Sequence, residues 1–260
     1  MALRNRWVLI ATALMVLFAL ALTLAGSAPT GVLGVDLLTV SVASMATLSV
    51  YLLPLLALLM AFDAVAAEQK RGTLALLLTY PLSRGELLAG KMVAHLAALA
   101  IAVFAGFGSA GAAAWALGGA DGASLAALFR LGWSPVPLGG AFLAIGYAVS
   151  ALARAPGEAA GMAIGIWIVF VVLYDLGLLG ALVFDDGGTF SADIFRWLLA
   201  ANPADAFRIF NLSGEREMAL ISGLAGASDA LPGRAYLTSL LVWPFAGLAL
   251  ARAAIKRLEP

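Results

Sequence analysis

The chain has 260 residues, of which 63% are hydrophobic and 12% are charged, whereas soluble domains carry about 25% charged residues. This composition excludes a water-soluble single domain. Lysine plus arginine and aspartate plus glutamate number 15 each, so no basic excess points to a nucleic-acid partner. The chain has no cysteine and a single histidine, His95, which argues against disulfides and multi-histidine sites. We therefore expect no metal and no cofactor bound by this chain.

The uncharged runs predict an all-α, polytopic membrane protein with six transmembrane helices in one domain, residues 1–260. A helix needs about 20 mainly apolar residues to cross a hydrocarbon layer of ~30 Å. The predicted spans are 7–26, 41–62, 92–117, 136–153, 159–184 and 235–251, with a local break expected at Pro54. The first run exceeds the ~7–15 residues of a signal-peptide core, so we expect it to remain in the membrane.

The distribution of lysine and arginine predicts that both termini are cytoplasmic. Six spans place the two termini on one side, and 10 of the 15 basic residues lie in the termini, the 2/3 loop and the 4/5 turn. Cytoplasmic loops carry an excess of lysine and arginine. Residues 63–91 are therefore predicted inside the cell and residues 185–234 outside it.

The cytoplasmic segment 63–91 carries two local signals. An apolar, helix-compatible stretch, 73–80, is flanked by charge and ends at Pro81. It needs either a docking surface on another protein or the lipid surface to cover it. Ser83 and Glu86 then have the spacing of a capping box, which predicts that a helix begins there.

Residues 85–91 mimic the spacing of a phosphate-binding loop, but Met92 stands where serine or threonine is required. The predicted capping box makes this stretch helical rather than a glycine-rich turn. We therefore expect no nucleotide site in this chain, so any energy from ATP must come from another polypeptide.

The outer segment 185–234 contains a helix-start pattern. Asn202 can act as the N-cap, Pro203 suits the first helical position and Asp205 places an acid in the first turn. A short helix through Phe210 is predicted. The apolar and aromatic residues around it indicate that parts of this segment lie at the membrane interface or re-enter the membrane.

Two acids lie at or in predicted spans. Asp63 marks the end of the second span and Asp175 lies inside the fifth. A carboxylate within the membrane is expensive and often functional. Asp63 can simply be solvated, whereas Asp175 can either make an interhelical hydrogen bond or carry an ion or proton. We expect His95, near the start of the third span, to be a hydrogen-bonded interface residue rather than a ligand.

Two stripes of small residues allow helix backbones to approach closely. Gly157, Gly161 and Gly165 open the fifth span, and a second stripe in the third span runs from Gly106 to Ala114. The sequence does not distinguish packing inside one subunit from packing between two copies.

The stretch from Phe62-Asp63-Ala64, through the charged turn 68–71, to Lys91 resembles the signature of ABC-2 type permeases, the membrane subunits of ABC transporters (type V exporter-like fold). The resemblance implies a homodimer that binds two copies of a separate ABC ATPase, which carries the ATP and magnesium. The segment 63–91 would then be the coupling region that fits a groove on the ATPase. The implied ATPase-coupling residues are Glu68, Lys70, Arg71, Gly72, Thr73, Leu76, Tyr80, Pro81, Ser83, Arg84 and Glu86.

Residues 42–63 and 202–208 are further similar to the ABC-2 permeases that serve maturation of nitrous oxide reductase. This likeness implies a bacterial inner-membrane permease, not an enzyme, that helps assemble a copper-sulfur centre by handling a sulfur species rather than copper. It also implies a periplasmic β-helical partner on the outer segment. The implied contact residues are Asn202, Pro203, Asp205, Phe207 and Arg208.

Two alternatives stay open from the sequence. The first is a generic ABC-2 exporter of a lipid, drug or peptide, which differs only in cargo and outer partner. The second is a secondary transporter that couples protons through Asp175 and needs no ATPase.

Overall fold

The computed structural model describes residues 6–25, 37–73, 83–118, 121–185, 194–212 and 231–256. Within these ranges the chain forms helices joined by turns, and no strand occurs among them. The prediction of an all-α chain is confirmed.

The helices are α1 (Arg6–Ala25), α3 (Leu37–Ala61), α4 (Ala66–Lys70), α6 (Arg84–Gly118), α7 (Gly122–Trp133), α8 (Pro135–Leu152), α9 (Pro156–Ile168), the π-helical segment η2 (Val169–Leu173), α10 (Tyr174–Asp185), α11 (Phe195–Ala201), α12 (Pro203–Leu212) and α14 (Gly233–Lys256).

Five segments of the described chain are long and apolar enough to cross a membrane: Leu37–Lys70, Arg84–Gly118, Gly122–Leu152, Pro156–Asp185 and Gly233–Lys256. The 20-residue helix α1 is about 30 Å long at 1.5 Å per residue and supplies a sixth. The structure is therefore consistent with six spans.

The fourth segment begins earlier than residue 136. Asp121 caps α7, because its carboxylate accepts a hydrogen bond from the Ser124 amide at 2.7 Å and the Ser124 hydroxyl accepts one from the Asp121 amide at 3.1 Å. This reciprocal cap starts a helix at Gly122 that leads through Ser134 into α8. Residues predicted as a loop are helical for that reason.

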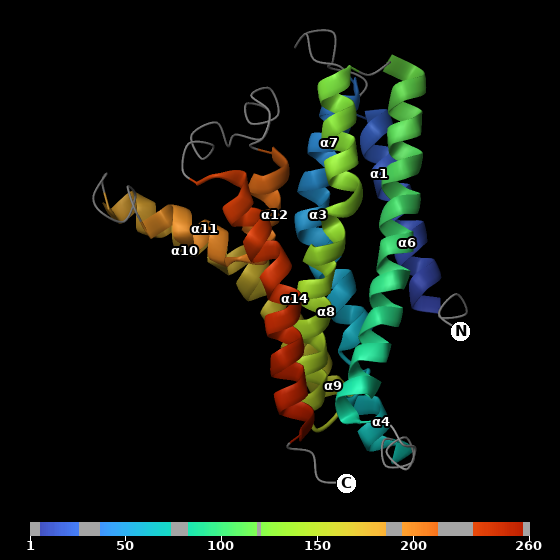
Figure 1. Cartoon of the computed structure of the whole chain (residues 1–260), viewed down its shortest axis with the longest axis vertical. Coiled ribbons are helices and arrows are strands. Elements are labelled where there is room, and N and C mark those ends of the chain that lie inside the picture. Colours follow the sequence, from blue (N-terminus) through green and yellow to red (C-terminus); the bar gives the residue numbers. More distant parts are fainter. Residues whose placement is uncertain are drawn as a thin grey trace.

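The helices stand as an elongated bundle with α8 at its centre (Figure 1). Two glycines let neighbours approach α8 closely. A Cβ on Gly146 of α8 would lie 2.7 Å from the Ala61 Cβ of α3, and a Cβ on Gly247 of α14 would lie 2.7 Å from the Ala144 Cβ of α8. Separations below 3.0 Å are not tolerated, so α3 and α14 pack on α8 with backbones nearly in contact.

The small-residue stripe of the third span serves packing within the chain. A Cβ on Gly106 of α6 would lie 3.0 Å from the Met15 backbone of α1, and Ala110 and Ala114 are fully buried. By contrast, no heavy atom lies within 4 Å of a Cβ built at Gly157, Gly161 or Gly165 of α9. That stripe has no partner helix among the described residues.

Two spans differ from the sequence prediction. Pro54 was expected to break the second span, but α3 continues through it from Leu37 to Ala61. Proline removes one amide donor, and the packing of this helix, where Leu53 and Ala57 are buried, is sufficient to hold the adjacent turns. The fifth span was expected to be a single helix and instead changes to π geometry at Val169–Leu173.

After the π segment the chain leaves the bundle. In Figure 1, α9 runs beside the other helices, whereas α10 and α11 project sideways from them. Kinks of this kind are typical of π segments, where an extra residue disrupts the regular ladder of hydrogen bonds. The helices α11 and α12 belong to the predicted outer segment 185–234.

Candidate functional site

The helix α4 lies at one end of the bundle, which we call the α4 end, and it is attached there by a serine of the fourth span. The Ser150 hydroxyl accepts hydrogen bonds from the Val65 amide at 2.9 Å and from the Ala66 amide at 3.0 Å. Helices begin with amides that have no internal partner. Ser150 is fully buried in α8, so the centre of the bundle supplies the cap of α4.

A lysine of the third span also holds this turn. Lys91 of α6 donates to the Ala64 carbonyl at 2.8 Å and forms an ion pair with Glu68 of α4. Both side chains are about one-fifth exposed, at 24% and 21%. The helix α4 is thus joined to three spans. It follows α3 along the chain, Ser150 of α8 accepts the amides at its start, and Glu68 pairs with Lys91 of α6.

The end of α4 is formed by Arg71, Gly72 and Thr73. The Arg71 Nε donates to the Ala67 carbonyl at 3.0 Å, and the Thr73 hydroxyl donates to the Glu68 carbonyl at 3.3 Å. Gly72 has a φ of +72°, a left-handed conformation that glycine adopts without the penalty of a side chain. This geometry turns the chain away from α4.

The predicted capping box is confirmed at the start of α6. The Glu86 amide donates to the Ser83 hydroxyl at 3.2 Å, and the Ser83 amide donates to the Glu86 carboxylate at 2.7 Å. Residues 85–91 are helical and do not form a phosphate-binding loop. Arg84 donates to the Ile255 carbonyl of α14 at 3.1 Å, which joins the start of α6 to the last helix at the α4 end.

Of the remaining predicted coupling residues, Lys70 is exposed in the last turn of α4. Leu76, Tyr80 and Pro81 lie outside the described residues.

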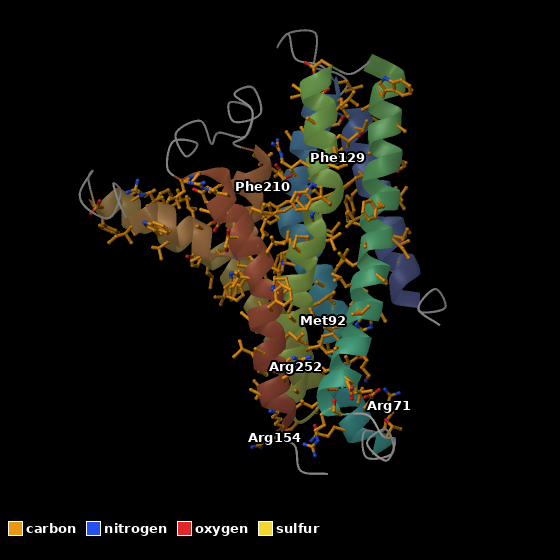
Figure 2. The ribbon with its side chains drawn as sticks, viewed as in Figure 1. Arg71, Met92, Phe129, Arg154, Phe210 and Arg252 are labelled. Atoms are coloured by element: carbon orange, nitrogen blue, oxygen red, sulfur yellow. The ribbon has the colours of Figure 1, made fainter. Side chains whose placement is uncertain are left out.

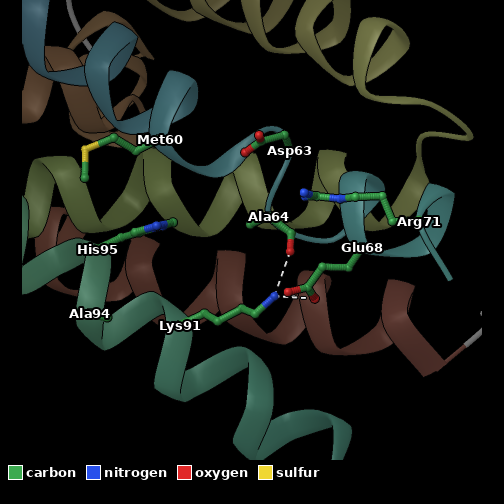
Figure 3. A pocket seen from close by; sticks show the side chains of 8 residues that line it. All are labelled: Met60, Asp63, Ala64, Glu68, Arg71, Lys91, Ala94 and His95. Carbon is green, nitrogen blue, oxygen red and sulfur yellow. Dashed lines mark hydrogen bonds and ion pairs between the residues drawn. The ribbon is translucent and has the colours of Figure 1, made fainter. Parts of the chain in front are cut away.

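Above α4, a polar cavity of about 430 Å³ opens between the second and third spans (Figure 3). The side chains that line it are Met60, Asp63, Ala64, Glu68, Arg71, Lys91, Ala94 and His95. Asp63, predicted as an acid at the end of a span, faces this cavity. Two acidic side chains, two basic side chains and one imidazole line the cavity. A cavity with this lining is suited to binding a polar group.

His95 is held as the sequence predicted. Its Nδ1 lies 2.9 Å from the Tyr147 hydroxyl of α8, and the two rings stack at 5.8 Å between centroids. Within the described part of the chain, no group of three histidine, aspartate or glutamate side chains could hold a metal ion.

A second polar site lies at the bend of the fifth span. The Asn202 side-chain amide donates to the Phe170 carbonyl inside η2 at 2.7 Å, while its oxygen accepts from the Ala204 amide at 2.9 Å. The π segment frees a carbonyl, and Asn202 satisfies it while capping α12 as predicted. The Tyr174 hydroxyl donates to the Leu198 carbonyl of α11 at 2.7 Å, a second contact across the bend.

Asp175 makes an interhelical ion pair. Arg208 of α12 donates to the two carboxylate oxygens of Asp175 at 2.8 and 3.3 Å, and to the Asp205 carboxylate at 2.5 Å. Asp205 is 1% exposed. Of the two interpretations of Asp175, the structure shows the interhelical hydrogen bond.

The residues predicted to contact an outer partner lie on or beside α12, most of which is buried. Asn202, Pro203, Asp205 and Phe207 are buried inside this chain, and Arg208 is occupied by the two aspartates. Both polar and apolar side chains of α12 are buried, because the helix packs against α3 and α14. Of these residues, Asn202 and Arg208 contact the bent span directly, and contact with an outer partner stays a prediction.

Sequence reasoning missed Ser150, the residue that holds α4. A hydroxyl inside an otherwise apolar span is a weak signal, because serines in membrane helices commonly bond to their own backbone. Ser49 does so here, donating to the Met45 carbonyl at 2.7 Å. The contacts of Ser150 are 84 and 85 residues away along the chain, beyond the reach of any local pattern.

Residues 1–257 match the model of the ABC-2 family transporter proteins. The chain is 41% identical over 261 residues to the probable ABC transporter permease protein NosY of Stutzerimonas stutzeri, with 98% of this chain and 94% of the relative covered. It is 42% identical over 259 residues to the protein of the same name from Pseudomonas aeruginosa, with the same coverage. The likeness covers the α4 end, the bent fifth span and the outer helices together, and the chain belongs to the ABC-2 family of transporter permeases.

Proposed function

We propose that this permease transmits ATP-driven movement of a separate ABC ATPase through the segment 63–91 to the membrane spans, in the maturation of nitrous oxide reductase. The observation that carries the coupling role is the attachment of α4 to three spans. A force applied to α4 reaches α8 through Ser150 and α6 through Lys91.

The orientation of the coupling region also supports this role. Figure 2 shows Arg71, Arg154 and Arg252 toward the α4 end, while Phe129 lies nearer the opposite end. Basic residues accumulate on the cytoplasmic side of membrane proteins. The α4 end is therefore proposed to face the cytoplasm, where an ATPase reaches it.

The coupling role is tested with Ser150→Ala. The substitution leaves two helix-start amides without their acceptor, at a cost of about 1–3 kcal/mol for an unsatisfied buried group. We expect the ATPase to co-purify but its transport-linked hydrolysis to fall. The matched control is Ser49→Ala, a buried span serine that bonds only to its own helix. If both variants hydrolyse ATP with undiminished coupling, Ser150 does not transmit the movement.

The assignment to nitrous oxide reductase maturation rests on the likeness to the NosY permeases. This assignment implies three kinds of partner: two copies of the ATPase, a second copy of this chain and a periplasmic β-helical protein. Because α12 is buried, docking of the outer protein is proposed to use other residues of 185–234, such as the exposed Ile194 and Trp197. A sulfur species is the proposed cargo.

Co-expression with the neighbouring proteins, gentle solubilisation and a pull-down through a C-terminal tag test these partners. We expect an ATPase in equal copy number with this chain, together with a β-helical protein. An ATPase alone favours the generic exporter. Recovery without an ATPase that is present and stable contradicts the coupling proposal itself.

A further inference from the structure

The cluster of Asp175, Asp205 and Arg208 has one negative charge too many. Arg208 is the only cation that the described residues place on the two carboxylates. It bonds to both Asp175 oxygens but to one oxygen of Asp205, and the other, Asp205 Oδ2, is buried without any hydrogen-bond partner. A buried, uncompensated carboxylate is costly, and such groups usually become neutral.

We propose that Asp205 binds one proton while Arg208 is paired with Asp175 of α10, and that breaking this interhelical pair releases the proton. The proton removes the surplus charge and gives the orphaned Oδ2 a hydrogen to donate. The cluster is thus a proton-binding site that closes the bend of the fifth span.

The surroundings of Asp205 favour the neutral acid. Burial raises the pKa of Asp205 to about 8, the nearby charge of Asp175 raises it further, and Arg208 opposes the rise. Tyr174 of α10 also faces this carboxyl, and Tyr51 of α3 faces Arg208. The charged groups that act on Asp205 are Arg208 of its own helix and Asp175 of α10.

The location links this proton to movement of the fifth span. Asp175 lies on α10, directly after Tyr174. Asn202 immediately precedes α12, and Arg208 lies near the middle of that helix. Asn202 holds the bend at Phe170, and Arg208 holds the helix that follows the bend. If α10 moves away, the charge of Asp175 is removed and Arg208 pairs with Asp205 alone. The pKa of Asp205 then falls toward the ordinary aspartate value of about 3.9.

The sign of the pH effect follows from this difference. The closed arrangement binds the proton more tightly than the open one, so closure is favoured at low pH and is lost progressively as the pH rises from about 4 to about 8. Over that interval the ratio of open to closed molecules should rise about tenfold per pH unit. Above about pH 8 the ratio should become constant.

The proton itself can be observed by infrared spectroscopy of the full chain in lipid vesicles, since the carbonyl stretch of a protonated carboxyl is separate from the amide bands. We expect this signal at neutral pH, its loss with a midpoint near 8, and its absence in Asp205→Asn. In Asp175→Asn, Arg208 pairs with Asp205 alone, so the midpoint should fall by roughly 1–3 units. Absence of the signal from the unaltered chain at pH 6 overturns the proposal.

The link to movement is measured by hydrogen exchange of the α10 amides, corrected for the intrinsic pH dependence of exchange. The unaltered chain should open about tenfold more readily per pH unit between about 5 and 8. Asp205→Asn preserves the shape of the side chain and stays neutral, so its opening should not depend on pH. An equal pH dependence in the two proteins would show that Asp205 does not control the bend.

Discussion

At the scale of single residues, Asn202 has two separable tasks. Its oxygen caps α12 and its amide nitrogen satisfies the Phe170 carbonyl of the π segment. Serine is as good an N-cap as asparagine, but it is too short to reach η2. A serine at this position would therefore keep the cap of α12 and remove the hydrogen bond to the Phe170 carbonyl.

We expect Asn202→Ser to keep α12 and to loosen the bend. The Phe170 carbonyl loses its donor at a partly buried position, which costs about 0.5–1.5 kcal/mol. Hydrogen exchange should accelerate across 169–173 while α12 stays protected. Thr238→Ala is the control, because the Thr238 hydroxyl donates only to the Arg234 carbonyl of its own helix. Equal exchange in both variants would contradict the role of Asn202.

Residue patterns in the sequence predicted the local bonds and not the distant ones. The cap of Ser83 with Glu86 and the cap that Asn202 forms at the start of α12 were identified because a cap joins residues two or three positions apart. Ser150 and Arg208 were not assigned their partners, since those contacts connect separate helices. The buried position of α12 was missed for the same reason, because an N-cap pattern is identical on an exposed and on a buried helix.

At the scale of the elements, α9 presents a face that nothing in the described chain covers. Its three glycines are open, and in α9 only Ala159 and Ala163 are buried. Small residues at four-residue spacing allow two membrane helices to approach closely. We infer that this face is where a second copy of the chain packs.

We expect Gly161→Leu to reduce the fraction of dimer, because the added side chain separates the two backbones. The control is Gly108→Leu on α6, which is equally open and should leave the dimer intact. The measurement is the mass of the purified permease in detergent, with its ATPase present. A dimer that survives Gly161→Leu would place the interface on another face.

The spans themselves were largely predictable, because hydrophobicity and length alone define them. Their ends were not. The fourth segment begins at Gly122 because a capping box starts a helix within a glycine-containing stretch. The fifth segment changes to π geometry at 169–173, where the sequence is uniformly apolar and gives no signal. Helix geometry inside an apolar run is decided by partners such as Asn202.

At the scale of the whole molecule, the side of the membrane on which each end lies can be measured directly, because the chain has no cysteine. We expect Lys256→Cys, at the exposed end of α14, to react with a membrane-impermeant maleimide only after cells are opened. Asp121→Cys, at the opposite end, should react in intact spheroplasts. The reverse pattern would invert the proposed orientation and place α4 out of reach of an ATPase.

The π segment has a consequence for how this fold can vary between relatives. A turn of π-helix holds one residue more than a turn of α-helix, so a bent and a straight fifth span are separated by a single deletion. Each residue of an α-helix turns the chain by about 100°. Removal of one residue from Val169–Leu173 would rotate all of α10 by that amount and carry Asp175 to a different face, away from Arg208. Deletion of a single residue is therefore expected to convert the bent fifth span into one continuous α-helix.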